Sequence, residues 1–96
     1  MQILKKNIMG NIRNLKKDIN YVLGDIIEAV YTWEYLNLDK DTKESEKIID
    51  EAINVFDILI AEVNQKNVDD KKKHFKSINL KLEENGKMLI DKINKL

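Results

Sequence analysis

The sequence has no cysteine and no proline, and only three of its 96 residues are glycine. Without cysteine there is neither a disulfide nor a thiolate metal site, which agrees with a reducing compartment. Without proline, no residue forces a break in a helix. The apolar fraction is 43% and the charged fraction is 35%. These values indicate a chain that is almost entirely helical and folds as one domain, residues 1–96.

Residues suited to catalysis are also scarce. His74 is the only histidine, and the sequence contains no Glu-x-x-His pair of the kind that di-iron bundles use. It has no glycine-rich phosphate loop and no nucleophile beside a base. Acids at helical spacing, such as Glu46 and Asp50, are typical of a solvated helix face, because a hard-cation site draws its oxygens from a loop. We therefore expect no enzyme activity, no metal and no cofactor.

Long apolar runs are absent as well. No stretch approaches the roughly 20 apolar residues that a membrane-spanning helix needs. Residues 1–7 lack the continuous apolar core of a secretory signal. We therefore expect a soluble, cytoplasmic protein. Frequent Lys, Asn, Ile and Asp indicate an A+T-rich coding sequence, which favours a bacterial or phage origin.

The longest pattern lies near the N-terminus, where apolar residues recur every three or four positions. They are Leu4, Ile8, Ile12, Leu15, Ile19, Val22, Ile26, Val30 and Trp33. On a helical wheel they fall within about 80° of arc, which predicts one long helix over residues 2–37. A break near Gly24, followed by Asp25 and Glu28, would instead give four helices. The apolar phase passes through Gly24 unchanged, which favours the continuous helix.

Two further helices follow. Residues 42–64 carry a broad apolar face of about 160°, wide enough for two neighbours, after Asp41 or Thr42 as N-cap. Residues 68–95 carry a narrow, coiled-coil-like stripe, with Asn67 as the expected N-cap and a weak point at Asn85–Gly86. The sequence therefore predicts an all-α, antiparallel three-helix bundle with a long first helix.

The unequal helix lengths leave the first dozen residues beyond the bundle. Three seam residues lie on this overhang: Leu4, Ile8 and Ile12. Exposed apolar surface of this kind normally has a partner. A homodimer in which two overhangs cover each other, a frayed terminus, a different protein partner and a fold-back at Gly10 remain alternatives.

The net charge is zero, but the charges are unevenly distributed. Residues 18–65 contain twelve acids and three lysines, and basic residues dominate on both sides. An up-down-up fold brings many of the basic residues to one end, among them Lys5, Lys6, Arg13, Lys71, Lys72, Lys73 and Lys76. This basic end is either a solvated surface or a contact for an anionic partner. Nucleic acid is the less favoured partner, because the acidic end would repel phosphate.

Aromatic residues gather near the predicted first turn. Trp33 lies on the apolar seam, whereas Tyr31, Tyr35 and Leu38 lie toward the polar side. The latter three either cover neighbouring aliphatic groups or form an anchor patch for a protein partner beside Glu28 and Glu34.

These observations predict a small, non-catalytic protein that acts by stoichiometric binding to another protein, as inhibitors, immunity proteins, antitoxins and chaperones do. The contact would be the overhang with the basic end, or the Tyr31, Tyr35 and Leu38 patch. Self-association as a homodimer is compatible with this role. The alternative is peripheral binding to nucleic acid or to an anionic membrane through the basic end.

Overall fold

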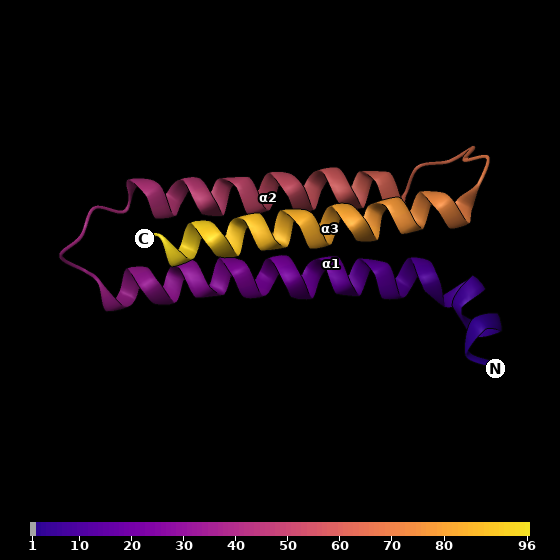
Figure 1. Cartoon of the computed structure of the whole chain (residues 1–96), viewed down its shortest axis with the longest axis horizontal. Coiled ribbons are helices and arrows are strands. Elements are labelled where there is room, and N and C mark those ends of the chain that lie inside the picture. Colours follow the sequence, from indigo (N-terminus) through magenta and orange to yellow (C-terminus); the bar gives the residue numbers. More distant parts are fainter. Residues whose placement is uncertain (1) are drawn as a thin grey trace.

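The chain forms three helices that run alternately up, down and up (Figure 1). They are α1 (Gln2–Leu36), α2 (Lys43–Val63) and α3 (Lys71–Asn94). The computed structural model describes the backbone of residues 2–96 and the side chains of residues 12–96. All three helices pack against one another. The predicted all-α three-helix bundle is therefore confirmed.

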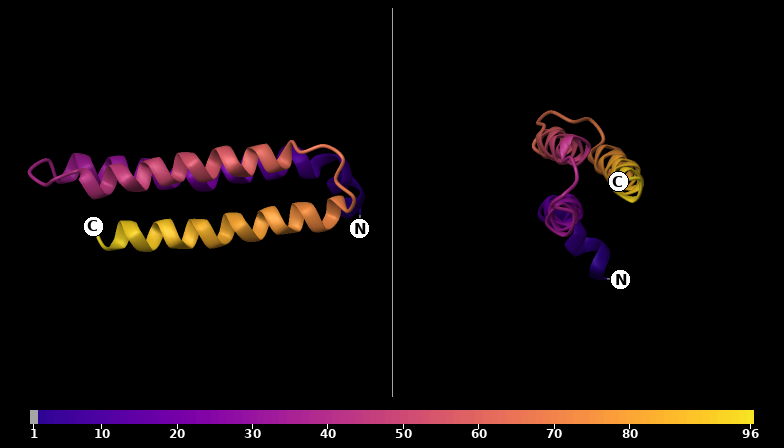
Figure 2. Two further views of the ribbon diagram at one scale, coloured as in Figure 1. Left: turned by 90° about the horizontal axis from the view of Figure 1, so that it is seen from above. Right: turned by 90° about the vertical axis from the view of Figure 1, so that its left-hand side faces the viewer.

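The first helix continues through Gly24 without a break, so the four-helix alternative does not apply. The apolar phase explains this result, because the residues before and after Gly24 turn the same side of α1 to the core. The first turns of α1 bend away from the axis of the rest and away from α2 (Figures 1 and 2). Among the described residues, no helix combines the length and apolarity needed to cross a bilayer.

The core runs between all three helices. Its buried apolar residues are Leu15, Ile19, Leu23, Ile26, Val30, Ile48, Ile49, Ala52, Leu59, Val63, Ile78, Leu82 and Leu89. Leu23 lies outside the predicted seam but is only 1% exposed. Val22 and Trp33, which lie on the predicted seam, are half-buried. The buried residues of α1 again span about 80°, but this arc is rotated by about 20° from Val22 toward Leu23.

Helix α3 begins three residues later than predicted. The Asp70 side chain caps it by accepting a hydrogen bond from the backbone N–H of Lys73 at 3.1 Å. Asn67, the predicted cap, instead has φ 61° in the preceding turn, a left-handed conformation that asparagine tolerates. The prediction of Asn67 as the cap is therefore wrong, and Lys71, Lys72 and Lys73 form the first turn of α3.

Gly86 is buried, and α3 passes through it without interruption. A Cβ atom built at Gly86 would lie 3.4 Å from the Val22 Cγ1 atom of α1. A side chain much larger than a methyl group would therefore not fit between α3 and α1 at this level. Asn85–Gly86, the predicted weak point of the narrow stripe, is thus a place where α3 packs against Val22 of α1 in the folded chain.

Candidate interaction surfaces

The most exposed large apolar side chains lie where α1 ends. Tyr35, Leu36 and Leu38 are 75%, 72% and 83% exposed, and we call these three residues the tip patch. Tyr31, one turn earlier on α1, is 55% exposed. The structure thus leaves all three predicted residues, Tyr31, Tyr35 and Leu38, open to solvent. Leu36 was not among the predicted residues, although its position off the seam would also have indicated exposure.

Hydrogen bonds hold the backbone around the tip patch. The Asn37 side-chain amide donates to the Trp33 carbonyl at 2.8 Å, which satisfies one of the free carbonyls at the end of α1. The backbone N–H of Lys40 donates to the Asn37 carbonyl at 2.9 Å and closes the following turn. The tip patch therefore stands on an ordered turn, and its exposure does not come from a loose terminus.

The end of the bundle that holds the tip patch is not purely acidic. Lys92 and Lys95 of α3 line a hollow there together with Asp41, Glu44 and Glu51. The Lys92 Nζ atom lies 2.6 Å from Glu51 Oε1 and 2.8 Å from Oε2, joining α3 to α2. The separation of charge between the two ends is weaker than the sequence predicts, because α3 returns lysines to the end with the tip patch.

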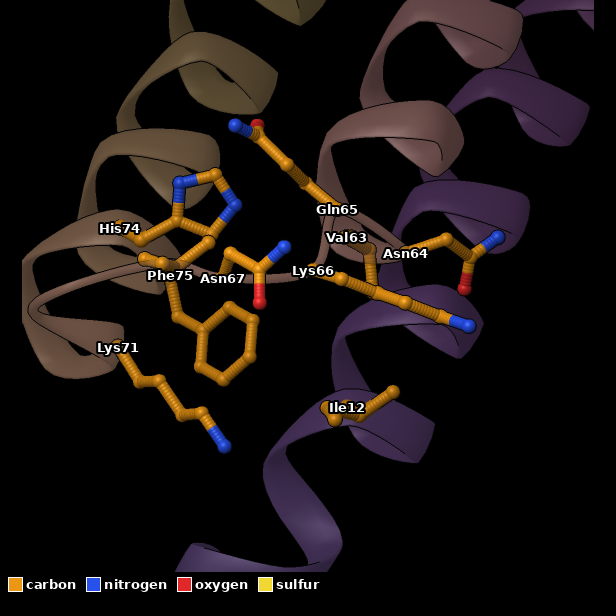
Figure 3. Close-up of a pocket in the computed structure, with 10 residues that line it drawn as sticks. Ile12, Val63, Asn64, Gln65, Lys66, Asn67, Lys71, His74 and Phe75 are labelled. Carbon is orange, nitrogen blue, oxygen red and sulfur yellow. The ribbon is translucent and has the colours of Figure 1, made fainter.

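At the opposite end, the α2–α3 connection encloses a pocket of about 340 Å³ (Figure 3). Ile12 of α1, Val63 of α2 and Phe75 of α3 supply its apolar lining. In Figure 3 the Lys66 and Lys71 side chains extend on either side of the Phe75 ring. Ile12, one residue of the predicted overhang, is 42% exposed and forms part of this lining. The side chains of Leu4 and Ile8 lie outside the described residues, so the predicted contact of the overhang stays a prediction.

The predicted basic residues come together only in part. Lys71 lines the pocket in Figure 3, and Lys72 and Lys76 line the next hollow beside Asn14 and Asp18 of α1. Lys73 and Arg13 are exposed on α3 and α1. The side chains of Lys5 and Lys6 lie outside the described residues. Among the side chains described, ion pairs join Lys47 to Glu44, Lys81 to Glu62 and Lys92 to Glu51, and none includes the lysines of the first turn of α3.

His74 takes part in a structural contact that the sequence analysis did not identify. Its Nε2 atom lies 2.6 Å from the Glu62 carbonyl oxygen near the end of α2. Because a carbonyl oxygen only accepts, Nε2 carries the hydrogen and donates it. The ring also tilts against Phe75 at a centroid distance of 5.7 Å. Among the described residues, no three potential metal ligands converge at His74 or elsewhere.

A third surface lies between α1 and α2. Asn20, Leu23, Gly24 and Ile27 of α1 face Ile53 and Phe56 of α2 across a hollow of about 210 Å³. Ile53 is 46% exposed, although it lies beside buried core residues.

Comparison of the chain with family models, with curated proteins and with solved structures found no match.

Proposed function

We propose that this chain is a non-catalytic helical protein that acts by binding another protein stoichiometrically, in the manner of an inhibitor, immunity protein, antitoxin or chaperone. The observation that supports this proposal is the exposure of the tip patch. Tyr35, Leu36 and Leu38 are more exposed than any other large apolar residue in the described part of the chain. A protein partner would remove all three side chains from water at one contact.

The composition of the tip patch suits an interface anchor. An aromatic side chain gives a large contact area at little cost in conformational entropy, and tyrosine is frequent among residues that dominate binding energy. Charged side chains around the turn, Asp39, Lys40 and Asp41, would form the polar rim that surrounds such an anchor. Glu34 is already occupied by Ser45 inside the protein, so we assign it no role in the contact.

The test combines cross-linking with a titration. A photoreactive amino acid replaces Tyr35 in one sample and Leu80 in a matched control, because Leu80 is also exposed, at 53%, but lies on α3. In cells of the source organism we expect one protein to be cross-linked from position 35 and not from position 80. That protein, purified, should bind at a 1:1 ratio in calorimetry. The double substitution Tyr35→Ser and Leu38→Ser should weaken binding by about tenfold or more, and Leu80→Ser should leave it unchanged. Equal effects from both positions would refute the proposal.

A second candidate function is supported by the first turn of α3. Cations are disfavoured at a helix N-terminus, yet Lys71, Lys72 and Lys73 occupy this turn and make no ion pair with the described side chains. Helix stability therefore does not account for them. Binding of a polyanion, nucleic acid or an anionic membrane, would account for them and should weaken steeply between low and moderate salt. Replacing all three lysines with glutamine should abolish such binding and leave a contact through the tip patch intact.

A further inference from the structure

The face of α1 and α2 that points away from α3 carries an apolar surface without cover from the described side chains. The end-on view of Figure 2 shows α3 packed to one side of the α1/α2 pair, with no helix on the other. We call this side the open face and define it by Gly24 and Ile27 of α1 and Ile53 and Phe56 of α2. In the end-on view of Figure 2 the backbone of the first turns of α1 leads away from α2 and not onto the open face.

The groove between α2 and α3 differs from the open face because ion pairs cross it. Lys81 reaches Glu62 at 2.7 Å, and Lys92 reaches Glu51 at 2.6 Å. Among the described side chains, no hydrogen bond or ion pair crosses the open face from Asn20, Gly24 or Ile27 to α2. Of these two surfaces, the open face is therefore the one that is freer to receive another helix pair.

Gly24 lines the open face and has no packing role within the chain. A Cβ atom built at Gly24 would meet nothing within 4 Å, whereas one at Gly86 would touch Val22. Glycine weakens a helix interior relative to alanine, so its presence needs a reason. Close approach of a second backbone is one such reason, because glycine has no side chain to hold it away.

The exposed side of α1 carries a charge pattern that is complementary to itself. A stripe of residues spaced three or four apart runs along it: Arg13, Lys17, Asn20, Gly24, Glu28, Tyr31 and Tyr35. Basic residues precede Gly24, and an acid and two tyrosines follow it. When two α1 helices cross antiparallel at Gly24, Lys17 of one copy comes level with Tyr31 of the second copy, one turn from its Glu28. Asn20 likewise comes level with Glu28 of the second copy.

This antiparallel register brings groups together that attract each other. Lysine pairs with glutamate and also interacts favourably with the face of a tyrosine ring. A parallel arrangement in register would instead place Lys17 against Lys17 and Glu28 against Glu28, which repel. The charge pattern of the stripe is thus complementary between two copies that are related by a two-fold axis close to Gly24.

We propose that a second copy of this chain docks on the open face, giving an antiparallel four-helix contact about a two-fold axis at Gly24. The stripe from residue 13 to residue 35 is about 33 Å long, and two helices are about 20 Å wide. The footprint is then roughly 660 Å² on each copy, which falls within the range of specific dimers. This contact shares Tyr35 with the tip patch, but Lys17, Gly24 and Glu28 lie outside the patch, so the tests below do not depend on the proposed function.

A cross-linking experiment tests the position of the axis. The chain has no cysteine, so a single introduced cysteine reports one distance. Gly24→Cys should form a disulfide-linked dimer at micromolar concentration under mild oxidation, because the axis places position 24 beside its own copy. Ser77→Cys, exposed on α3, is the matched control and should stay monomeric on denaturing gels. Equal cross-linking at positions 24 and 77 would overturn the proposal.

Light scattering and sedimentation equilibrium on the full chain test the non-covalent contact. The unmodified chain should be a dimer, and a monomer at every soluble concentration would overturn the proposal. Gly24→Leu should weaken dimerisation by about tenfold or more. It should keep its helical circular dichroism, since a Cβ there meets nothing within the chain. Ser77→Leu, which adds the same side chain on α3, should leave the dimer unchanged.

Charge reversal tests the register. Lys17→Glu and Glu28→Lys should each weaken the dimer, and the two substitutions together should restore it, because the exchanged charges again lie one turn apart in the two copies and attract each other. The recovery isolates the pairing, since loss of folding would not be reversed by a second substitution. Absence of recovery would overturn the antiparallel register at Gly24.

Discussion

The hydroxyl of Ser45 on α2 lies 2.5 Å from the Glu34 Oε2 atom on α1, and Ser45 is completely buried. The Ser45 Oγ atom also lies 2.9 Å from the Thr42 carbonyl oxygen. Ser45 is the third residue of α2, so this contact fixes where the second helix starts relative to the end of the first. Among the described side chains, Ser45 is the only fully buried polar residue of the core.

Ser45→Ala should lower the free energy of unfolding by about 1–3 kcal/mol, because the Glu34 carboxylate loses its donor in a partly buried place. Glu34→Gln should cost less, since the amide oxygen still accepts from Ser45. Thermal or urea unfolding followed by circular dichroism measures both changes. Thr32→Ala is the matched control. Its hydroxyl is exposed and donates only to the Glu28 carbonyl of its own helix, so the change should stay within about 0.5 kcal/mol.

The contact between Gly86 and Val22 leads to a second prediction. A Cβ at position 86 would lie 3.4 Å from the Val22 Cγ1 atom, which is ordinary van der Waals contact. Gly86→Ala should therefore keep the fold and gain up to about 1 kcal/mol from helix propensity. Gly86→Leu should destabilise by about 1–3 kcal/mol, because its branched end has no room between α3 and α1. Urea unfolding measures both changes. A large loss of unfolding free energy for Gly86→Ala would show that a methyl group does not fit between position 86 and Val22.

Much of the fold could be predicted from the sequence. The phase of the apolar residues gave three helices and the continuity of α1 through Gly24, because a helix turns one side to the core whatever its neighbours are. The exposure of Tyr31, Tyr35 and Leu38 also followed from their positions off the seam. These properties depend on the periodicity of a single helix, which is a local quantity.

Other features could not be predicted because they depend on contacts between helices. The burial of Leu23 reflects the side on which α2 packs, which the phase of α1 alone does not determine. In the sequence Gly86 interrupts the apolar stripe of α3. Its packing role is visible only in the structure, where Val22 lies opposite it. The open face likewise exists only once α3 is known to lie on the other side of the α1/α2 pair.

The Lys92–Glu51 pair offers a prediction of a small effect. Its side chains are 42% and 39% exposed, so water and salt screen the attraction between them. Lys92→Ala should lower the free energy of unfolding by less than about 1 kcal/mol. Leu59→Ala, in the buried core of α2, should cost about 2–5 kcal/mol in the same urea titration. A larger loss for Lys92→Ala than for Leu59→Ala would mean that ion pairs, and not apolar packing, hold α3 to α2.

His74 connects the start of α3 to the end of α2, and its removal should be felt at this junction. The ring donates to the Glu62 carbonyl at 2.6 Å and rests against Phe75. His74→Ala should therefore destabilise the chain by about 1 kcal/mol or more, through the lost hydrogen bond and the lost packing. Lys73→Ala, one residue earlier and exposed, should change stability by less than about 0.5 kcal/mol. Because the junction is local, amide hydrogen exchange should rise most between Val63 and Phe75 in His74→Ala. A uniform rise across all three helices would instead show that His74 stabilises the bundle only as a whole.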